Sequence, residues 1–214
     1  MYESIAKALE KNNIECKIAK DKAEALEIVK GMLFKGAVIS NGGTVTLAET
    51  GVLDLIKNGD YTYLDRSKDG ITREEQFDIY RQTANADFFF CSSNALTQNG
   101  ELINVDGLSN RISSILFGPK KVVMIVGKNK IVKDVNEGFL RVKRIAAPLN
   151  CERLNLDTPC RKLGHCVSLE KSSNPSMTDG CSIDRRICGN YLVSAKQMIK
   201  DRICVILVDE NLGY

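Results

Sequence analysis

Short apolar segments alternate along this chain with longer segments whose apolar residues recur every three or four positions. The short segments predict buried strands, and the longer ones predict helices with one apolar face. The predicted strands are 14–19, 37–40, 61–64, 88–91, 121–126 and 203–208. The predicted helices are 1–13, 22–33, 46–56, 72–84, 108–117, 135–147 and 187–198. This alternation favours an α/β fold with a largely parallel sheet.

Local signals place some of the helix ends. Thr46 with Glu49, and Thr72 with Glu75, have the spacing of a capping box, which predicts a helix start at each threonine. Pro148 follows the periodic segment 135–147. Because proline removes a backbone donor and clashes with the preceding turn, we expect that helix to end before it.

A polar interval, residues 92–111, separates two of the most apolar predicted strands. Inside it, Asn99 and Gly100 stand between the short apolar segments 96–98 and 102–104, which predicts a hairpin with a type I′ turn. Polar residues at strand ends commonly face a ligand or cap a helix. This interval is therefore a candidate for part of a functional site.

The chain is long enough for one full-sized core, since it has 214 residues of which 43% are hydrophobic. We expect a single α/β domain over 1–214. From about 150 to 186 the periodicity fails, and cysteine, proline, serine and glycine accumulate. That region predicts a long loop excursion from the domain.

Charge and hydropathy limit the partners. The 30 basic and 27 acidic residues are scattered and give a net charge of +3, which is too little for a nucleic-acid footprint. No apolar run approaches the roughly 18 residues that would span a bilayer, and the N-terminal segment predicts an amphipathic helix rather than a signal peptide. We expect a cytoplasmic protein that binds neither nucleic acid nor membrane.

The first candidate turn joins a predicted strand to a predicted helix and consists of Asn41, Gly42, Gly43 and Thr44. Its backbone N–H groups and the Thr44 hydroxyl would suit a phosphate or carboxylate at a helix N-terminus, where the dipole contributes about 0.3–1 kcal/mol. The alternative is a tight turn that needs glycine only for its backbone geometry. No Gly-Lys-Ser/Thr sequence follows, so the turn is not a Walker loop.

A second group of candidates lies in the polar interval. Ser93 and Asn94 follow the strand 88–91, and Asp106, Asn110 and Arg111 surround the start of the next predicted helix. Arg111 is suited to bind a carboxylate or phosphate with two parallel hydrogen bonds. The alternative is that Asp106 caps the helix and pairs with Arg111.

A third turn follows the strand 121–126 and contains Asn129 and Lys130. Ligands of open α/β sheets gather beyond the carboxyl ends of the strands, so Lys130 would lie near the first turn. A solvated surface lysine is the alternative. The predicted ligand-binding residues are Asn41, Gly42, Gly43, Thr44, Ser93, Asn94, Asp106, Asn110, Arg111, Asn129 and Lys130.

The eight cysteines fall into two groups. Cys16, Cys91 and Cys204 lie in predicted strands, where cysteine behaves as a small apolar residue. The remaining cysteines are Cys151, Cys160, Cys166, Cys181 and Cys188. Thiolates from this second group could hold a metal.

The metal ligands predicted from that group are Cys160, Cys166, Cys181 and Cys188. An iron–sulfur cluster suits them better than zinc, because zinc sites usually contain cysteines two to four residues apart. Free thiols and redox-active disulfides are open alternatives. The only histidine, His165, is either a ligand or proton-transfer group or an exposed loop residue, and it excludes a multi-histidine site.

Four stretches resemble the LUD-domain family, which is named for lactate utilisation and includes lactate utilisation protein C. They are NGGTVTLAETGVL (41–53), ADFFFCSSNALTQNGELINVDGLSNR (86–111), FGPKKVVMIVGKNKIV (117–132) and VILVDENLGY (205–214). The resemblance implies a three-layer αβα fold similar to ribose-phosphate isomerases, sugar-phosphate deaminases and CoA transferases. In those relatives a glycine–threonine turn holds phosphate, and residues 41–44 occupy the comparable place. No glutamate here is identifiable as a CoA-transferase nucleophile.

The cysteine-rich region resembles a subgroup of that family with recurring P-C, G-x-C and R-I-C elements. The matching elements are Pro159-Cys160, Gly164-His165-Cys166 and Arg186-Ile187-Cys188. The chain departs from the subgroup in two places: 167–180 is an insertion, and Ile183-Asp184 stands where Ser-Pro is usual. Both departures weigh against a compact four-cysteine cluster.

These observations lead to three hypotheses about function. The first is a protein of organic-acid (lactate) utilisation that binds a small anionic metabolite and works with other subunits of a lactate-oxidising complex. The second is an iron–sulfur or thiol redox subunit of an electron-transfer assembly. The third is an isomerase or transferase that acts on a phosphorylated or CoA-linked substrate. Fold likeness alone does not choose among them.

Overall fold

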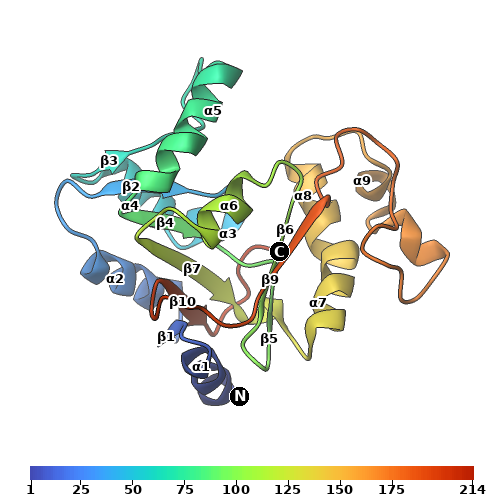
Figure 1. Cartoon of the computed structure of the whole chain (residues 1–214), viewed down its shortest axis with the longest axis horizontal. Coiled ribbons are helices and arrows are strands. Elements are labelled where there is room, and N and C mark those ends of the chain that lie inside the picture. Colours follow the sequence, from blue (N-terminus) through green and yellow to red (C-terminus); the bar gives the residue numbers. More distant parts are fainter.

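The computed structural model describes residues 1–214 and has a six-stranded sheet at its centre (Figure 1). In spatial order the strands are β1 (Glu15–Ala19), β10 (Ile203–Val208), β7 (Lys121–Gly127), β4 (Phe88–Cys91), β2 (Val38–Asn41) and β3 (Thr62–Tyr63). All neighbouring pairs are parallel. The central strands are almost entirely apolar and buried, as expected of a parallel sheet that is covered on both faces.

Helices cover the two faces of this sheet. Alternate residues of β7 point to opposite faces, so Val123 and Ile125 join one core while Val122 and Met124 join the other. The helices over the first face are α2 (Lys22–Met32), α3 (Val45–Glu49) and α4 (Val52–Asn58), and those over the second are α1 (Tyr2–Lys11) and α6 (Asn110–Leu116). The fold is therefore the predicted three-layer αβα sandwich with a parallel sheet.

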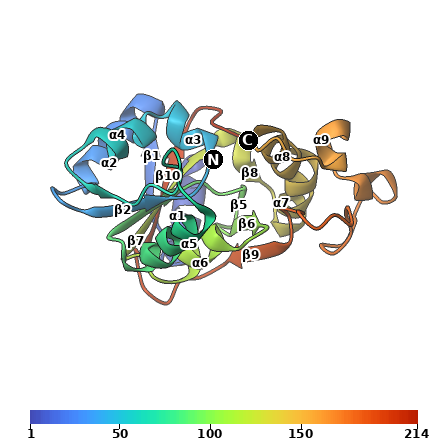
Figure 2. The same cartoon turned by 90° about the horizontal axis from the view of Figure 1, so that it is seen from above.

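A smaller second sheet lies beside the first. Its order is β8 (Ile131–Val132), β5 (Ala95–Thr97), β6 (Leu102–Asp106) and β9 (Asn190–Ser194). The helices α7 (Val135–Arg141) and α8 (Ala147–Arg153) lie on the side of this sheet away from the parallel sheet (Figure 2). The chain leaves the parallel sheet after β4 and after β7 to build this second sheet, and both exits lie at the carboxyl ends of strands.

The predicted hairpin forms, but its turn is of another type. β5 and β6 are antiparallel with Leu96 opposite Leu102. The Gly100 N–H donates to the Thr97 carbonyl (3.0 Å) and the Thr97 N–H donates to the Glu101 carbonyl (2.9 Å). Gly100 has a φ of +84°, whereas Asn99 is not among the residues with positive φ. This is a three-residue loop with a left-handed glycine, rather than type I′, which needs two residues with positive φ.

The helix after the glycine turn differs from its prediction. It begins at Val45 with Thr44 as N-cap, and the Thr44 hydroxyl accepts from the Thr46 N–H (3.2 Å), so Thr46 is not the cap. It stops at Gly51, whose φ of 73° breaks the predicted helix 46–56 into α3 and α4. The second predicted capping box is present: Thr72 and Glu75 exchange bonds at the start of α5 (Arg73–Gln82).

The prediction that a helix ends before Pro148 is wrong. α7 passes through a π-helical turn, Val142–Ala146, directly into α8, where Pro148 occupies the first turn. The π turn places the Ala147 N–H against the Val142 carbonyl, five residues back. Because the hydrogen-bond pattern changes there, proline is accommodated at the start of the new helical segment.

The region after α8 is irregular for much of its length. It contains the short helix α9 (Pro159–Leu163) and a 3₁₀ turn, Val167–Glu170, and extends away from the sheets (Figure 1). The predicted helix 187–198 is wrong, because residues 190–194 form β9, an antiparallel partner of β6. Residues Tyr191–Val193 favour a strand once β6 offers an open edge.

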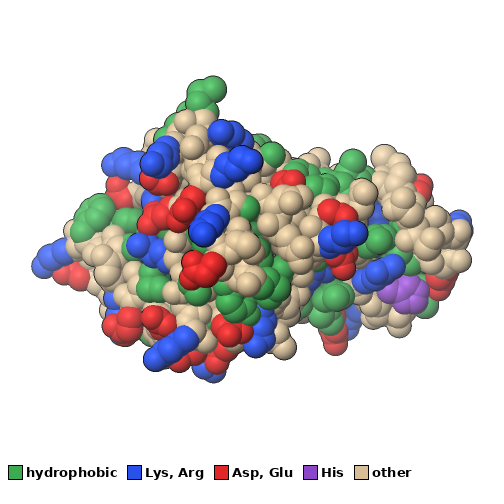
Figure 3. All heavy atoms as spheres, turned by 90° about the horizontal axis from the view of Figure 1, so that it is seen from below, with side chains coloured by type: hydrophobic (Ala, Val, Ile, Leu, Met, Phe, Trp, Pro, Cys, Tyr) green, Lys and Arg blue, Asp and Glu red, His purple; other side chains and the backbone are tan.

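The surface agrees with the scattered charge of the sequence. Lysine and arginine side chains are interspersed with aspartate and glutamate over the face seen in Figure 3. Across the chain, no helix combines the length and the apolar character needed to cross a bilayer.

Candidate functional site

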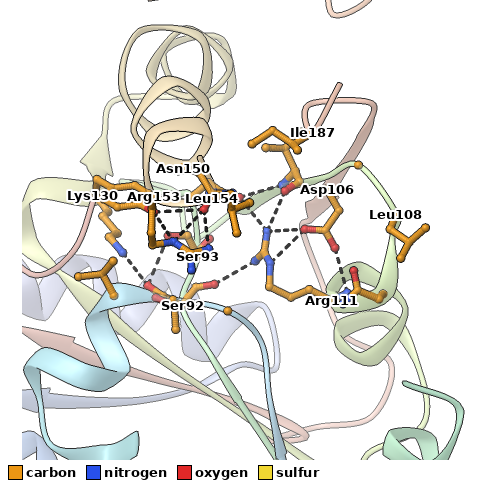
Figure 4. Close-up of a pocket in the computed structure, with 18 of the residues that line it drawn as sticks. Ser92, Ser93, Asp106, Leu108, Arg111, Lys130, Asn150, Arg153, Leu154 and Ile187 are labelled. Carbon is orange, nitrogen blue, oxygen red and sulfur yellow. Dashed lines mark hydrogen bonds and ion pairs between the residues drawn. The ribbon is translucent and has the colours of Figure 1, made fainter. Parts of the chain in front are cut away.

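A cavity of about 280 Å³ lies where the carboxyl ends of the parallel strands face the second sheet. Its walls come from the turns after β2, β3, β4, β6 and β7 and from α8 (Figure 4), and Tyr214 also lines it. The predicted site residues that line it are Gly43, Thr44, Ser93, Asn94, Asp106, Asn110, Arg111 and Lys130. The turns that were expected to converge from sequence therefore do converge.

The other predicted residues lie behind the wall. Asn41 is buried and accepts a hydrogen bond from the Tyr63 hydroxyl (2.7 Å). Asn129 accepts from the Leu212 N–H (3.1 Å) and donates to the Gly213 carbonyl (3.0 Å), which holds the segment that brings Tyr214 to the cavity. Asn41 and Asn129 thus support the site rather than line it.

The two glycines of the first turn lie against arginine side chains. Neither Gly42 nor Gly43 has a positive φ. A methyl group on Gly42 would lie 2.8 Å from Cδ of Arg111, and one on Gly43 would lie 2.5 Å from Nη2 of Arg66 and 3.5 Å from Nη2 of Arg153. Glycine at position 42 therefore admits the fixed side chain of Arg111, whereas the contacts at position 43 are with the far ends of flexible arginine side chains.

Asp106 caps α6 from outside the helix. Its carboxylate accepts from the N–H groups of Arg111 (3.0 Å) and Ile112 (2.8 Å), while the residue at the helix start, Ser109, has a φ of 65° and makes no cap bond. The same carboxylate forms a 3.0 Å ion pair with the guanidinium of Arg111. The structure thus has the capping and pairing arrangement that was the alternative to ligand binding.

Arg111 has no hydrogen-bond donor to spare. Its Nε donates to Asp106, Nη1 to the Ser92 carbonyl and Asn104 Oδ1, and Nη2 to Asn94 Oδ1 and the Val105 carbonyl. Guanidinium has five N–H groups, and each of them has a protein acceptor. Arg111 therefore joins β4, β6 and α6, and it shapes the cavity instead of offering free donors to it.

The side chains of Ser93 and Asn94, after β4, make most of their hydrogen bonds within the protein. The Ser93 hydroxyl lies within hydrogen-bond distance of the carbonyls of Ala95 (2.7 Å) and Ile103 (3.0 Å). Asn94 Oδ1 accepts from the Val105 N–H (2.8 Å), whereas no protein group accepts from its Nδ2. Of this pair, only the Asn94 amide retains a donor for a ligand.

Lys130 is a buried lysine, 2% exposed, and the surface-lysine alternative is wrong. Its Nζ donates to Ser92 Oγ (2.8 Å) and Thr46 Oγ1 (3.0 Å), and it has no ion pair with a carboxylate. Burial, followed by the charges of Arg141 and Arg111, lowers the pKa of Lys130 to about 7. At neutral pH a substantial fraction of this side chain is a neutral amine.

Two further cations at the cavity were not predicted from the sequence. Arg66 follows β3, and its buried Nε has no hydrogen-bond partner. Arg153, at the end of α8, donates through Nε to the Tyr214 hydroxyl (2.8 Å) and through Nη2 to Asn150 Oδ1 (2.7 Å). Neither guanidinium forms an ion pair with a carboxylate of the protein, so both keep an uncompensated positive charge beside Gly43.

The cysteine-rich region places two thiols together. Sγ of Cys151, in α8, lies 3.7 Å from Sγ of Cys160, in α9, and both side chains are buried. The hydrogen bond with Cys151 and those from Thr158 and the Arg161 N–H lower the pKa of Cys160 below its ordinary value, against the opposing effect of burial. The partner of Cys160 is thus Cys151, which was not among the predicted metal ligands.

The other predicted metal ligands have different neighbours. Cys166 Sγ lies 3.2 Å from Ser168 Oγ, and Cys188 Sγ accepts from Nε of Arg186 (3.2 Å). No group of three or more His, Cys, Asp or Glu side chains is arranged to hold a metal ion. The donor set as placed here does not match a four-cysteine cluster, and the iron–sulfur cluster stays a prediction. His165 is a partly exposed loop residue, 3.6 Å from Glu170.

The fold and the cavity together define an αβα protein whose polar site lies at the carboxyl ends of a parallel sheet. The sequence profile of the LUD domain matches residues 2–208, so the chain belongs to the LUD domain family, which is associated with lactate utilisation. A crystal structure of a DUF162 family protein from Deinococcus radiodurans aligns with 97% of this chain and 94% of its own, at 12% identity and a TM-score of 0.49. Among curated proteins, none matches this chain.

Proposed function

We propose that the cavity binds a small anionic metabolite of organic-acid utilisation. The observation that carries the proposal is that the guanidinium groups of Arg66 and Arg153 line one cavity and neither forms an ion pair with a carboxylate of the protein. The one acidic side chain at the cavity, Asp106, is already paired with Arg111. Clustered cations without counter-charges are unfavourable, and a bound anion would relieve that repulsion.

The donors available match a carboxylate or a phosphate. Planar guanidinium groups bind either anion through parallel hydrogen bonds. Gly43, Thr44 and Val45 line the same cavity, and their backbone N–H groups have no acceptor within the protein. The volume of about 280 Å³ lies at the small end of the range for small-molecule sites, which favours a compact acid over a CoA-linked substrate.

Isothermal titration calorimetry of the purified protein with lactate, pyruvate and inorganic phosphate tests this proposal. A charge-assisted hydrogen bond contributes about 1.5–3 kcal/mol, so R66A and R153A should each weaken binding by roughly ten- to a hundredfold. R81A is the matched control, because Arg81 is exposed and pairs with Asp78 on α5. Absence of heat with every probe, or equal affinities for all three variants and the wild type, would contradict the proposal.

The proposal also includes the cellular location and the partner subunits of the protein. We infer a cytoplasmic protein that associates with other subunits of a lactate-oxidising complex, in line with its family. Cell fractionation and co-purification from cells grown on lactate test both points. A phosphorylated sugar used as a fourth calorimetric probe tests the isomerase or transferase hypothesis on the same site.

A second candidate function, thiol redox chemistry, is favoured by the 3.7 Å separation of Cys151 and Cys160 Sγ. Oxidation by a low-molecular-weight disulfide would transfer two electrons and two protons to that reagent and join the two sulfurs. Peptide mass spectrometry after treatment with oxidised glutathione should find the Cys151–Cys160 disulfide in the wild type and in C166A, and should not find it in C160A.

The same samples distinguish the dithiol hypothesis from the iron–sulfur hypothesis. Anaerobically purified protein with iron, visible absorbance and no reactive pair would favour the cluster, and C166A should then lose both iron and colour. Reactive thiols without iron or zinc would favour the dithiol. Thiols that resist oxidised glutathione would remove the dithiol candidate.

A further inference from the structure

We propose that Lys130 is a nucleophile that forms an imine with the carbonyl carbon of an anionic aldehyde or ketone held in the cavity, a 2-oxo acid being the simplest case. This inference rests on the proposed function, because Arg66 and Arg153 would hold the anionic part of the substrate. It goes beyond that function by assigning a covalent step to one atom, Nζ of Lys130.

The hydrogen bonds around Lys130 fit a neutral amine. The Ser92 hydroxyl donates its hydrogen to the Ile125 carbonyl (2.6 Å), so Ser92 Oγ can only accept from Nζ. Thr46 Oγ1 is the one other partner of Nζ. A neutral amine has two hydrogens for these two oxygens and retains a free lone pair, whereas the third hydrogen of an ammonium has no acceptor within the protein.

The charges around Lys130 also favour its neutral amine form. Arg141, from α7, and Arg111, from α6, both disfavour the ammonium, while Glu49 on α3 and the Cys91 thiol on β4 oppose them with smaller effects. Arg141 is itself buried and fixed, since its guanidinium donates to the carbonyls of Asn129 and Asn94. Desolvation together with neighbouring cations is an established way to activate a lysine as a nucleophile.

The step needs no reagent beyond the substrate. The Nζ lone pair attacks the carbonyl carbon, the C=O π electrons move to oxygen, and a proton passes from nitrogen to that oxygen to give a carbinolamine. Loss of the hydroxyl group with a second nitrogen proton releases water and leaves the C=N bond. The Thr46 hydroxyl contacts Nζ, has no acceptor within the protein, and is placed to relay these protons.

Reductive trapping with pyruvate tests the inference on the full-length wild-type protein. At pH 7.5, Lys130 should have on the order of several hundred times the free-amine fraction of an ordinary lysine. Sodium borohydride should therefore reduce a pyruvate imine at Lys130 at least about tenfold faster than at exposed lysines, and peptide mass spectrometry locates the adduct. Inorganic phosphate should slow the labelling by competing for the cavity.

Lys143 serves as an internal control in the same sample. It is equally buried, but its Nζ contacts Ser168 and the Asp179 carbonyl outside the cavity, so it should not be labelled. K130M should abolish the adduct. Because the wild-type peptide map alone answers the question, a K130M variant that failed to fold would not matter.

The outcomes separate this inference from the proposed function. If pyruvate binds by calorimetry but gives no adduct at Lys130, the anion site stands and the imine is wrong. If pyruvate neither binds nor labels Lys130 while lactate or phosphate binds, only the imine is wrong, and if none of the three probes binds, both proposals are wrong. Labelling of Lys130 at the same rate as surface lysines also overturns the inference.

Discussion

At the scale of a single residue, the burial of Lys130 is the feature that bears most directly on function. A lysine is rarely fully buried without a carboxylate partner, and this one has only two hydroxyl groups. Burial costs the charged form, so part of the stability of the fold is given up to keep an amine at this position. Such a cost is common at functional sites, where perturbed pKa values cluster.

The pH dependence of stability should reveal this cost. Between the folded pKa of about 7 and the ordinary value near 10.5, the unfolded chain binds a proton that the folded chain does not, so the free energy of unfolding should rise with pH. From pH 7 to 8.5 the wild type should gain about 1.5 kcal/mol relative to K130M. Urea unfolding of both proteins at the two pH values measures this difference, and parallel changes would show that Lys130 is charged in the folded state.

At the scale of the elements, the decisive contacts join a strand end to a helix start. Asp106 ends β6, caps α6 and pairs with Arg111, whose remaining donors reach the ends of β4 and β6. The side chains of this pair are only 10% and 11% exposed. One carboxylate thus fixes the angle between α6 and the second sheet and with it one wall of the cavity.

Removing that carboxylate should therefore cost more than removing an ordinary cap. D106A should lower the free energy of unfolding by about 3 kcal/mol or more, since it leaves a buried guanidinium unpaired. D134A, which removes the exposed N-cap of α7, should cost about 1 kcal/mol. Chemical denaturation compares the two; similar losses would mean that the Asp106–Arg111 pair adds nothing beyond capping.

At the scale of the whole molecule, the parallel sheet was predictable because its strands are continuous apolar segments. The same reasoning placed three turns at one sheet edge, because ligand sites form beyond the carboxyl ends of strands. β9 was missed since its sequence becomes a strand only against the open edge of β6. That pairing joins residues far apart in the chain, so the local periodicity of the sequence does not indicate it.

A cavity lies where the sequence predicts the site, and the contacts of its residues differ in part from the predicted ones. Arg111 was identified as a ligand donor, yet its neighbours Asn94, Asn104 and Asp106 occupy its donors, which only the folded arrangement shows. Arg66 follows a two-residue strand, and Arg153 lies on a helix that was expected to have ended. No motif marks either arginine. Both guanidinium groups lie next to Gly43, a glycine that was visible in the sequence.

The π turn between α7 and α8 determines the direction in which the side chains of α8 point. Each residue of an α-helix turns the chain by about 100°, so one extra residue inside a turn rotates everything beyond it by about that angle. Asn150 and Arg153 lie within two turns of Val142–Ala146, and both face the cavity. In an uninterrupted helix of the same length they would point elsewhere. The π turn therefore orients α8 so that the Arg153 guanidinium points toward the edge of the parallel sheet.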